Sequence, residues 1–204
     1  MELKELKSNI IDMAREVEEI IDLISKGFIE NKSEYLDEAL DKEKEVNILE
    51  KSLTKGILNI SRQTFDKDFK EELVVLSQVI ESLERMGDEC AGLIERIEIK
   101  IQEKLLFPDI GVEEFNEVYN MMKVSVAGMI KILRHPKGEV EAKEVISNGF
   151  KIKDLIERYR KAHAERLVKG MCDPRASNMY FDMLDFTGNI ARHSSNIVKT
   201  LIAK

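Results

Sequence analysis

The sequence predicts an all-α protein made of about six long amphipathic helices. Apolar residues recur at intervals of three and four along almost the whole chain, which is the spacing of one helix face. Only three prolines, Pro108, Pro136 and Pro174, interrupt the 204 residues. Charged residues make up 35% of the chain and are mostly Glu and Lys, both good helix formers. No segment shows the pattern of a β-strand, so no sheet is expected.

Three helices are expected in the first half of the chain. Gly27 marks the expected end of the first, and Ser33 is the expected N-cap of the second. A polar stretch, Ser61–Asp68, separates the second helix from a third at about 69–105. The apolar positions of this third helix keep a sustained heptad spacing. We therefore expect it to pack nearly parallel or antiparallel to its neighbours.

Three more helices are expected in the second half. The clearest break in the chain is Phe107–Gly111. The fourth helix follows it and stops at His135–Gly138, where a histidine beside a proline is expected to cap the helix. A fifth helix is expected at about 139–168, and the turn Gly170–Ser177 precedes a last helix from about 178.

The order of medium and long helices is similar in the two halves, which predicts a tandem duplication of a three-helix unit. The first repeat is expected at 1–107 and the second at 111–204. Short connections place consecutive helices antiparallel, so each repeat is expected to be an up-down-up bundle. The alternative is a single six-helix bundle whose symmetry is accidental.

Composition and charge exclude several classes of partner. The net charge of −7 and the lack of a Lys/Arg-rich run argue against nucleic acid as a partner. An acidic surface is also repelled by anionic lipids, and no window approaches the roughly 18 consecutive apolar residues of a membrane span. The first residues contain no apolar run of a signal peptide. Cys90 and Cys172 have no CxxC spacing, so we expect reduced thiols in a cytoplasmic protein.

Several polar residues occupy positions on or beside the apolar faces of the second and third helices. Glu43 and Asn47 continue the apolar face of the second helix, and Glu84 and Asp88 lie one turn apart beside Gly87 in the third. An acid on such a face needs a cation, a hydrogen-bond donor or a metal as partner. Together the four side chains form a geometrically feasible, oxygen-rich metal site. Because acid pairs at this spacing are common in the chain, an ordinary solvated face is the alternative.

Nothing in the sequence argues for catalysis. We find no Ser/His/Asp or Cys/His arrangement, phosphate-cradling glycine loop or His-rich metal motif. His163 is expected to be a packed, hydrogen-bonded core residue rather than a ligand. A ferritin-type bundle needs a Glu-x-x-His pair on each of two helices, and neither His163 nor His193 has Glu three residues before it. We therefore expect a protein that is not an enzyme.

The segment ESLERMGDECAGLIERI resembles the third-helix motif of the PhoU family, the accessory regulators of bacterial and archaeal phosphate uptake. The motif reads acid-Arg-apolar-Gly-Asp, and Glu84–Asp88 match it in register. The preceding segment ALDKEKEVNILEKSL resembles the second-helix pattern of the family, with Glu43 and Asn47 in matching places. The later segments AERLVKGMCDP and YFDMLDFTGNIARHSSNI are similar to the PhoU-like tails of sodium/phosphate cotransporters.

The resemblance implies a tandem three-helix fold and a regulatory role in phosphate uptake. It implies a phosphate transporter, its ATPase subunit or a sensor kinase as partner at the cytoplasmic face of the membrane, and we expect a homodimer. It also implies a divalent metal or a metal cluster of iron or zinc. Carried over, Glu84 and Asp88 become the leading ligands, with Glu43 and Asn47 beside them.

The second repeat departs from the family pattern. An ungapped alignment places Gly188 where the acid belongs and Arg192 where the Asp belongs, and a shifted register would offer only Asp185 and Asn189. A guanidinium carries a permanent positive charge and no lone pair, so it opposes a cation. The metal is therefore expected in the first repeat only, and the arginine is expected to stabilise neighbouring acids. Two alternatives stay open: a carboxylate-bridged metal-binding or storage bundle, and a metal-free scaffold in which Glu84 and Asp88 pair with lysines.

Overall fold

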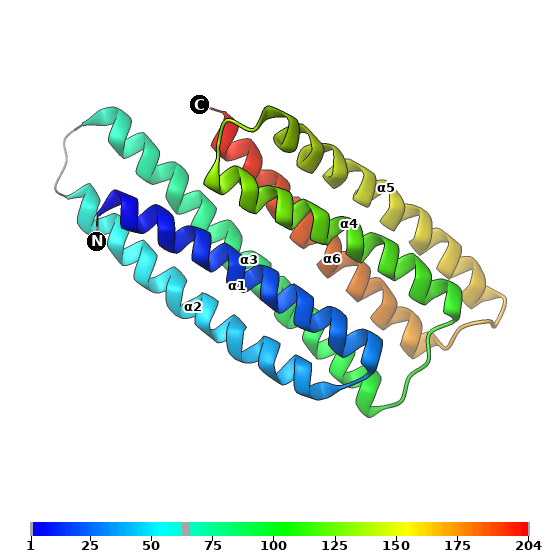
Figure 1. The fold of residues 1–204 in the computed structure, drawn as a ribbon. Coiled ribbons are helices and arrows are strands. Elements are labelled where there is room, and N and C mark those ends of the chain that lie inside the picture. Colours follow the sequence, from blue (N-terminus) through cyan, green and yellow to red (C-terminus); the bar gives the residue numbers. More distant parts are fainter. Residues whose placement is uncertain (1, 63–65, 204) are drawn as a thin grey trace.

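The computed structural model describes residues 2–62 and 66–203. In these residues the chain forms six helices and no strand: α1 Leu3–Glu30, α2 Ser33–Ser61, α3 Lys67–Gln102, α4 Asp109–Arg134, α5 Glu139–Val168 and α6 Pro174–Ile202. Figure 1 shows α1–α3 as one group of elongated helices and α4–α6 as a second group beside it. The predicted all-α fold is confirmed. None of the described helices has the length and apolar character needed to cross a bilayer.

The prediction that Gly27 ends the first helix is wrong. α1 continues to Glu30, and Asn31 then adopts a left-handed conformation with φ of 51°. Gly27 lies inside the helix where α2 comes close, and a Cβ at this position would lie 2.5 Å from Cδ2 of Leu36. The glycine is therefore explained by close helix packing. Stopping the helix is the role of the asparagine.

The starts of two helices also differ from the prediction. Ser33 is the first residue of α2 rather than its N-cap. α6 begins at Pro174 instead of near 178, because the Asp173 carboxylate accepts hydrogen bonds from the backbone N–H groups of the next turn. A proline in the first turn of a helix loses no hydrogen bond, because the N–H groups of that turn have no partner within the helix. Pro174 was expected in the turn before the last helix, but it is the first residue of α6. The predicted turn Gly170–Ser177 is correspondingly shorter.

The remaining boundaries lie close to the predicted ones. α3 ends at Gln102, and α4 begins at Asp109, so the predicted break at Phe107–Gly111 already contains the first turn of a helix. The connection between α2 and α3 falls within the predicted turn Ser61–Asp68, of which 63–65 lie outside the described residues. α5 covers the predicted range, and His135 stands at the C-cap of α4 as expected.

The two groups of helices share one continuous hydrophobic core. Consecutive helices pack together within each group, and α3 packs along α6 where the groups meet. Gly92 on α3 lets the ring of Phe186 on α6 approach at this seam. Nearby, Arg96 Nε donates a hydrogen bond of 2.9 Å to Asp182 Oδ2. The α3–α4 connection separates the two predicted repeats, and their origin by duplication stays a prediction.

Candidate functional site

The four predicted metal ligands lie on two helices that pack against each other, α2 and α3. Glu43 is buried, with 7% of its surface exposed, because it follows the buried residues of α2 in helical spacing. Asn47 and Glu84 are half-buried, and Asp88 is exposed. Three of the four predicted ligands are therefore at least partly buried, as the sequence predicted, and only Asp88 faces water.

The buried Glu43 has a hydrogen-bond partner on its own helix. The Asn47 Nδ2 donates a bond of 2.6 Å to Glu43 Oε1 from one turn further along α2. On α3, a Cβ on Gly87 would lie 3.3 Å from Val46 Cγ1 and 4.0 Å from Glu43 Cγ. The glycine thus explains how α2 packs this closely at Glu43. Close approach of a neighbouring helix is a common reason for a glycine inside a helix.

Glu84 is surrounded by other negative charges. Burial raises the pKa of Glu84, and the charges of Asp88 and Glu50 raise it further. The neighbouring Arg85 lowers this pKa, but its guanidinium makes an ion pair of 2.5 Å with Glu81. Glu84 and Asp88 form no ion pair within the described part of the chain. The face therefore carries uncompensated negative charge that a cation would neutralise.

Sequence reasoning did not count Glu50 among the ligands. It lies on α2, one turn beyond Asn47, and is half-buried. Its Oε1 accepts a hydrogen bond of 3.0 Å from Thr54 Oγ1. Its helical spacing from Asn47 already places both residues on one edge of α2, and its charge raises the pKa of Glu84 on α3.

The carboxylates are not gathered around one point. Among residues 2–62 and 66–203, no three His, Cys, Asp or Glu side chains are arranged to hold a metal ion. Carboxylate and amide oxygens are suitable ligands for a divalent cation or iron, so the donor chemistry fits such an ion. Metal binding at this face would therefore require its carboxylates to rotate towards a common point.

In the second group the corresponding positions have a different chemistry. Gly188 lies against Ile156 of α5, where a Cβ would be 2.7 Å from its Cδ1. Arg192, one turn further, is exposed and donates to Asn189 Oδ1 at 3.4 Å. Its positive charge lowers the pKa of Glu89 on α3, although burial raises that pKa overall. No ion pair joins Arg192 to an acid among the described residues, so its predicted role in stabilising a neighbouring acid stays a prediction.

A second polar cluster, which the sequence did not reveal, joins α4, α5 and α6. Arg166 forms two hydrogen bonds to the carboxylate of Glu114, of 3.0 and 2.5 Å. Tyr180 donates to the same carboxylate at 3.0 Å, and its ring stacks on His163. His163 is buried and lies 3.0 Å from the Ser177 hydroxyl, so its predicted role as a core residue is confirmed. Burial and the Arg166 charge lower the pKa of this histidine.

The chain is thus an all-helical protein with two groups of three helices and with acidic side chains along the face between α2 and α3. Residues 10–97, which lie within α1–α3, match the family model of the PhoU domain. The resemblance to the PhoU family that the sequence predicted is confirmed.

Individual relatives agree with this match. The chain is 24% identical over 176 residues to the "Phosphate-specific transport system accessory protein PhoU homolog" of Aquifex aeolicus (strain VF5), covering 85% of this chain and 76% of that protein. The crystal structure of PhoU from Pseudomonas aeruginosa superposes with a TM-score of 0.90 at 17% identity, over 98% of this chain and 95% of that one. The phosphate transport system regulatory protein PhoU from Streptococcus pneumoniae gives 0.80 at 18% identity, over 98% and 93%. These structures show that the fold is shared.

Proposed function

We propose that this protein is a non-enzymatic regulator of cellular phosphate uptake. The observation that carries the proposal is the PhoU domain at 10–97, together with a relative that is named an accessory protein of phosphate-specific transport. The protein acts by binding a phosphate transporter, its ATPase subunit or a sensor kinase at the cytoplasmic face of the membrane. It works as a homodimer in the cytoplasm.

The test of this function is the capture of the partner from native cells. The full chain carries an affinity tag, and bound proteins are identified by mass spectrometry from cells grown in high and in low phosphate. The expected result is specific recovery of a phosphate-transporter component or a sensor kinase. Deletion of the gene is expected to change phosphate uptake under the same conditions. Recovery of neither kind of partner and unchanged uptake would overturn the proposal.

The α2–α3 face is proposed to bind a divalent metal or an iron or zinc cluster in the first repeat. Glu84 and Asp88 would be the main ligands, with Glu43 and Asn47 next to them. Three features support this: the oxygen donors, the contact of the two helices, and the raised pKa of Glu84 beside other acids. Metal occupancy would tune the surface that meets the partner.

Elemental analysis tests the metal separately from the partner. Protein purified without chelator is expected to contain stoichiometric iron or zinc, and the Glu84→Ala/Asp88→Ala double variant is expected to lose it. The matched control is Glu34→Ala/Glu38→Ala, an exposed acid pair with the same spacing on α2. Equal metal content in both double variants would refute the site. Absence of metal from the wild type, with an unchanged stability of the α3 variant, would favour the scaffold alternative.

A further inference from the structure

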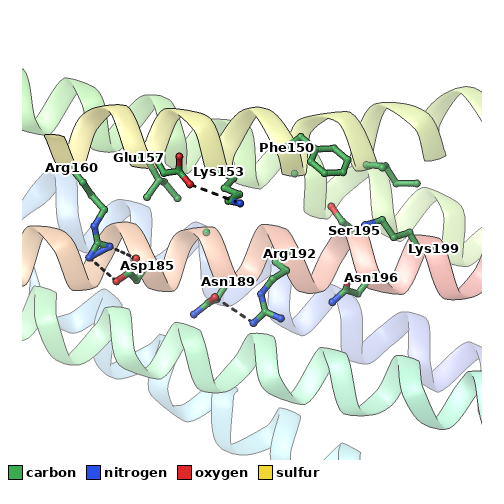
Figure 2. A pocket seen from close by; sticks show the side chains of 14 residues that line it. Phe150, Lys153, Glu157, Arg160, Asp185, Asn189, Arg192, Ser195, Asn196 and Lys199 are labelled. Carbon is green, nitrogen blue, oxygen red and sulfur yellow. Dashed lines mark hydrogen bonds and ion pairs between the residues drawn. The ribbon is translucent and has the colours of Figure 1, made fainter. Parts of the chain in front are cut away.

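A groove of about 580 Å³ runs between α5 and α6 in the second group of helices. Figure 2 shows that its labelled side chains come from both helices, Phe150 and Lys153 from α5 and Arg192 and Lys199 from α6. This volume lies within the range of small-molecule binding sites. The groove is separate from the α2–α3 face, so a ligand site here is independent of the proposed function.

The groove is positively charged in an acidic protein. Its lining contains four cationic and two acidic side chains: Lys153, Arg160, Arg192, Lys199, Glu157 and Asp185. The excess of two positive charges contrasts with the net charge of −7 for the chain. A groove with such an excess attracts anions and repels cations.

Two of the four cations already face a carboxylate. Arg160 forms a two-pronged ion pair with Asp185, with hydrogen bonds of 2.5 and 3.0 Å. Lys153 Nζ lies 3.9 Å from Glu157 Oε1 on the next turn of α5. Figure 2 shows both pairs as dashed lines along the groove. Within each pair the two charges cancel, so the excess belongs to the other two cations.

Within the described residues, Arg192 and Lys199 make no hydrogen bond or ion pair to a carboxylate, although the Arg192 charge also acts on Glu89 of α3. Neither forms an ion pair with any residue that the structure describes. The Arg192 guanidinium contacts the side-chain oxygen of Asn189 and the ring of His193, both at 3.4 Å. The Lys199 ammonium lies 5.5 Å from the centre of the Phe150 ring. Because they are seven residues apart on α6, both project from the same face of the helix into one groove.

The apolar part of the groove is fixed by close packing of the two helices. A Cβ on Gly149 would lie 2.5 Å from Ser195 Oγ, and one on Gly188 would lie 2.7 Å from Ile156 Cδ1. The glycines therefore bring α5 and α6 together beneath the cations. Phe150 has 63% of its surface exposed at the same groove, which leaves an aromatic surface available for stacking.

The charge of this face is opposite to that of the first group. In the ungapped alignment on the PhoU motif, Gly188 and Arg192 of α6 stand where Glu84 and Asp88 stand in α3. The α3 positions carry two carboxylates, whereas the aligned α6 positions carry a glycine and a guanidinium. The α2–α3 face is therefore acidic at these positions, whereas the α5–α6 groove carries a cation there.

We propose that the α5–α6 groove binds a phosphate monoester with an aromatic body, of the nucleoside monophosphate type. The excess of two positive charges matches the charge of a phosphate dianion. The planar guanidinium of Arg192 can donate two parallel hydrogen bonds to phosphate oxygens, and Lys199 supplies a second charge. The aromatic body lies against the exposed Phe150 ring.

Calorimetric titration of the full chain tests the site with three probes: AMP, adenosine and inorganic phosphate. AMP is expected to bind, and adenosine and inorganic phosphate are each expected to bind at least about tenfold more weakly, because each lacks one of the two recognised parts. AMP binding is expected to weaken at high salt, since the cations are exposed.

Substitutions then assign the roles of the residues. Arg192→Gln and Lys199→Gln are each expected to weaken AMP binding about fivefold to tenfold. Phe150→Ala is expected to weaken AMP binding without changing that of inorganic phosphate. The matched controls are Arg134→Gln and Lys161→Gln, which change exposed cations that do not line the groove. Thermal melting checks that each variant is folded, and no large change is expected because Arg192 and Lys199 are exposed.

Three results would overturn the proposal. If AMP binds no more tightly than adenosine, the groove does not recognise the phosphate. If inorganic phosphate binds as tightly as AMP, the groove does not recognise the aromatic body. AMP binding that is unchanged in the Arg192→Gln/Lys199→Gln double variant would place any anion site elsewhere on the molecule.

Discussion

Asn189 on α6 donates a hydrogen bond of 3.1 Å to Glu89 on α3, across the seam between the two groups of helices. Burial raises the pKa of Glu89, while Asn189 and the charge of Arg192 act in the opposite direction. The net rise means that the charged carboxylate is less favourable in the folded chain than in the unfolded chain. The seam thus contains an acid whose ionisation opposes folding.

Replacement of Glu89 by Gln is expected to stabilise the protein at neutral pH. The folded carboxyl has the raised pKa, so wild-type stability from this group is greatest below the unfolded pKa of about 4.3 and falls as the pH rises through the folded pKa. Gln stays neutral and can still accept the Asn189 bond. Thermal melting should show a gain of about 1–3 °C at pH 7 and almost none near pH 4. A gain that is equal at both pH values would contradict the assignment.

Glu84→Gln is expected to separate stability from metal binding. The pKa of Glu84 is raised by burial and by Asp88 and Glu50, so in metal-free protein the Gln variant should melt about 1–3 °C higher at pH 7. As with Glu89, this gain disappears when the pH falls below the unfolded pKa. The same variant should bind metal more weakly, because a carboxylate ligand is lost.

Calorimetry with and without chelator measures both effects. In wild-type protein the bound metal is expected to raise the melting temperature, since it binds the folded state. In Glu84→Gln this metal-dependent rise should be smaller, although the chelated variant is the more stable protein. A variant that loses stability in chelator would show that the carboxylate is already paired within the chain.

Helical periodicity predicted the number of helices and most of the core, because it depends on which residues face inward along a regular element. It also placed Glu43 on an inward edge, and this residue is 7% exposed. Helix ends were less predictable, since they depend on local contacts. Gly27 was interpreted as a stop, but the space that it leaves is used by Leu36 of the next helix. Asp173 starts α6 through hydrogen bonds that spacing alone does not reveal.

The candidate site shows the same limit. The sequence placed Glu84 and Asp88 on one helix and Glu43 and Asn47 on its neighbour, and the two helices do pack together. Spacing could not show that Asn47 itself satisfies Glu43, which removes much of the need for a metal there. Glu114 was predicted by no motif, because its partner Arg166 is distant in sequence and meets it only after the helices have packed.

The two thiols are expected to react very differently. Cys90 is fully buried, and burial raises the pKa of its thiol, whereas Cys172 is partly exposed near the start of α6. A disulfide reagent attacks through the thiolate, so the buried residue should be inert in the folded protein. One thiol per chain is expected to react at mildly alkaline pH, and both in denaturant. The Cys172→Ser variant should show almost no reaction when folded; rapid labelling of this variant would mean that the core around Cys90 opens readily.

Gly92→Ala is expected to loosen the seam between α3 and α6. A Cβ at this position would lie 2.5 Å from a ring carbon of Phe186, so the ring has to move out of its position. Alanine is the better helix former by about 1 kcal/mol, but overpacking of this kind costs about 1–3 kcal/mol, so a net loss of up to about 2 kcal/mol is expected. Urea denaturation measures the difference. The Gly92→Ala/Phe186→Leu double variant removes the clash and should recover part of the stability; equal losses in the two proteins would contradict the mechanism.

Arg166→Met is expected to be among the most damaging single changes in the second group of helices. The Arg166 and Glu114 side chains are only 14% and 10% exposed, and they meet through two hydrogen bonds. Removing the guanidinium leaves a buried carboxylate whose remaining partner is the Tyr180 hydroxyl. The loss of one partner of a buried ion pair costs about 3–5 kcal/mol, and urea denaturation should show a loss of this size.

The double variant Glu114→Gln/Arg166→Met tests whether the charge is the cause. The introduced glutamine is neutral and can still accept the hydrogen bond from Tyr180, so most of the stability lost in Arg166→Met should return. Methionine is unbranched and about as long as the aliphatic stem of arginine, so the comparison is mainly one of charge. If the double variant is as unstable as the single one, the loss comes from packing, and the Glu114–Arg166 pair contributes little beyond its volume.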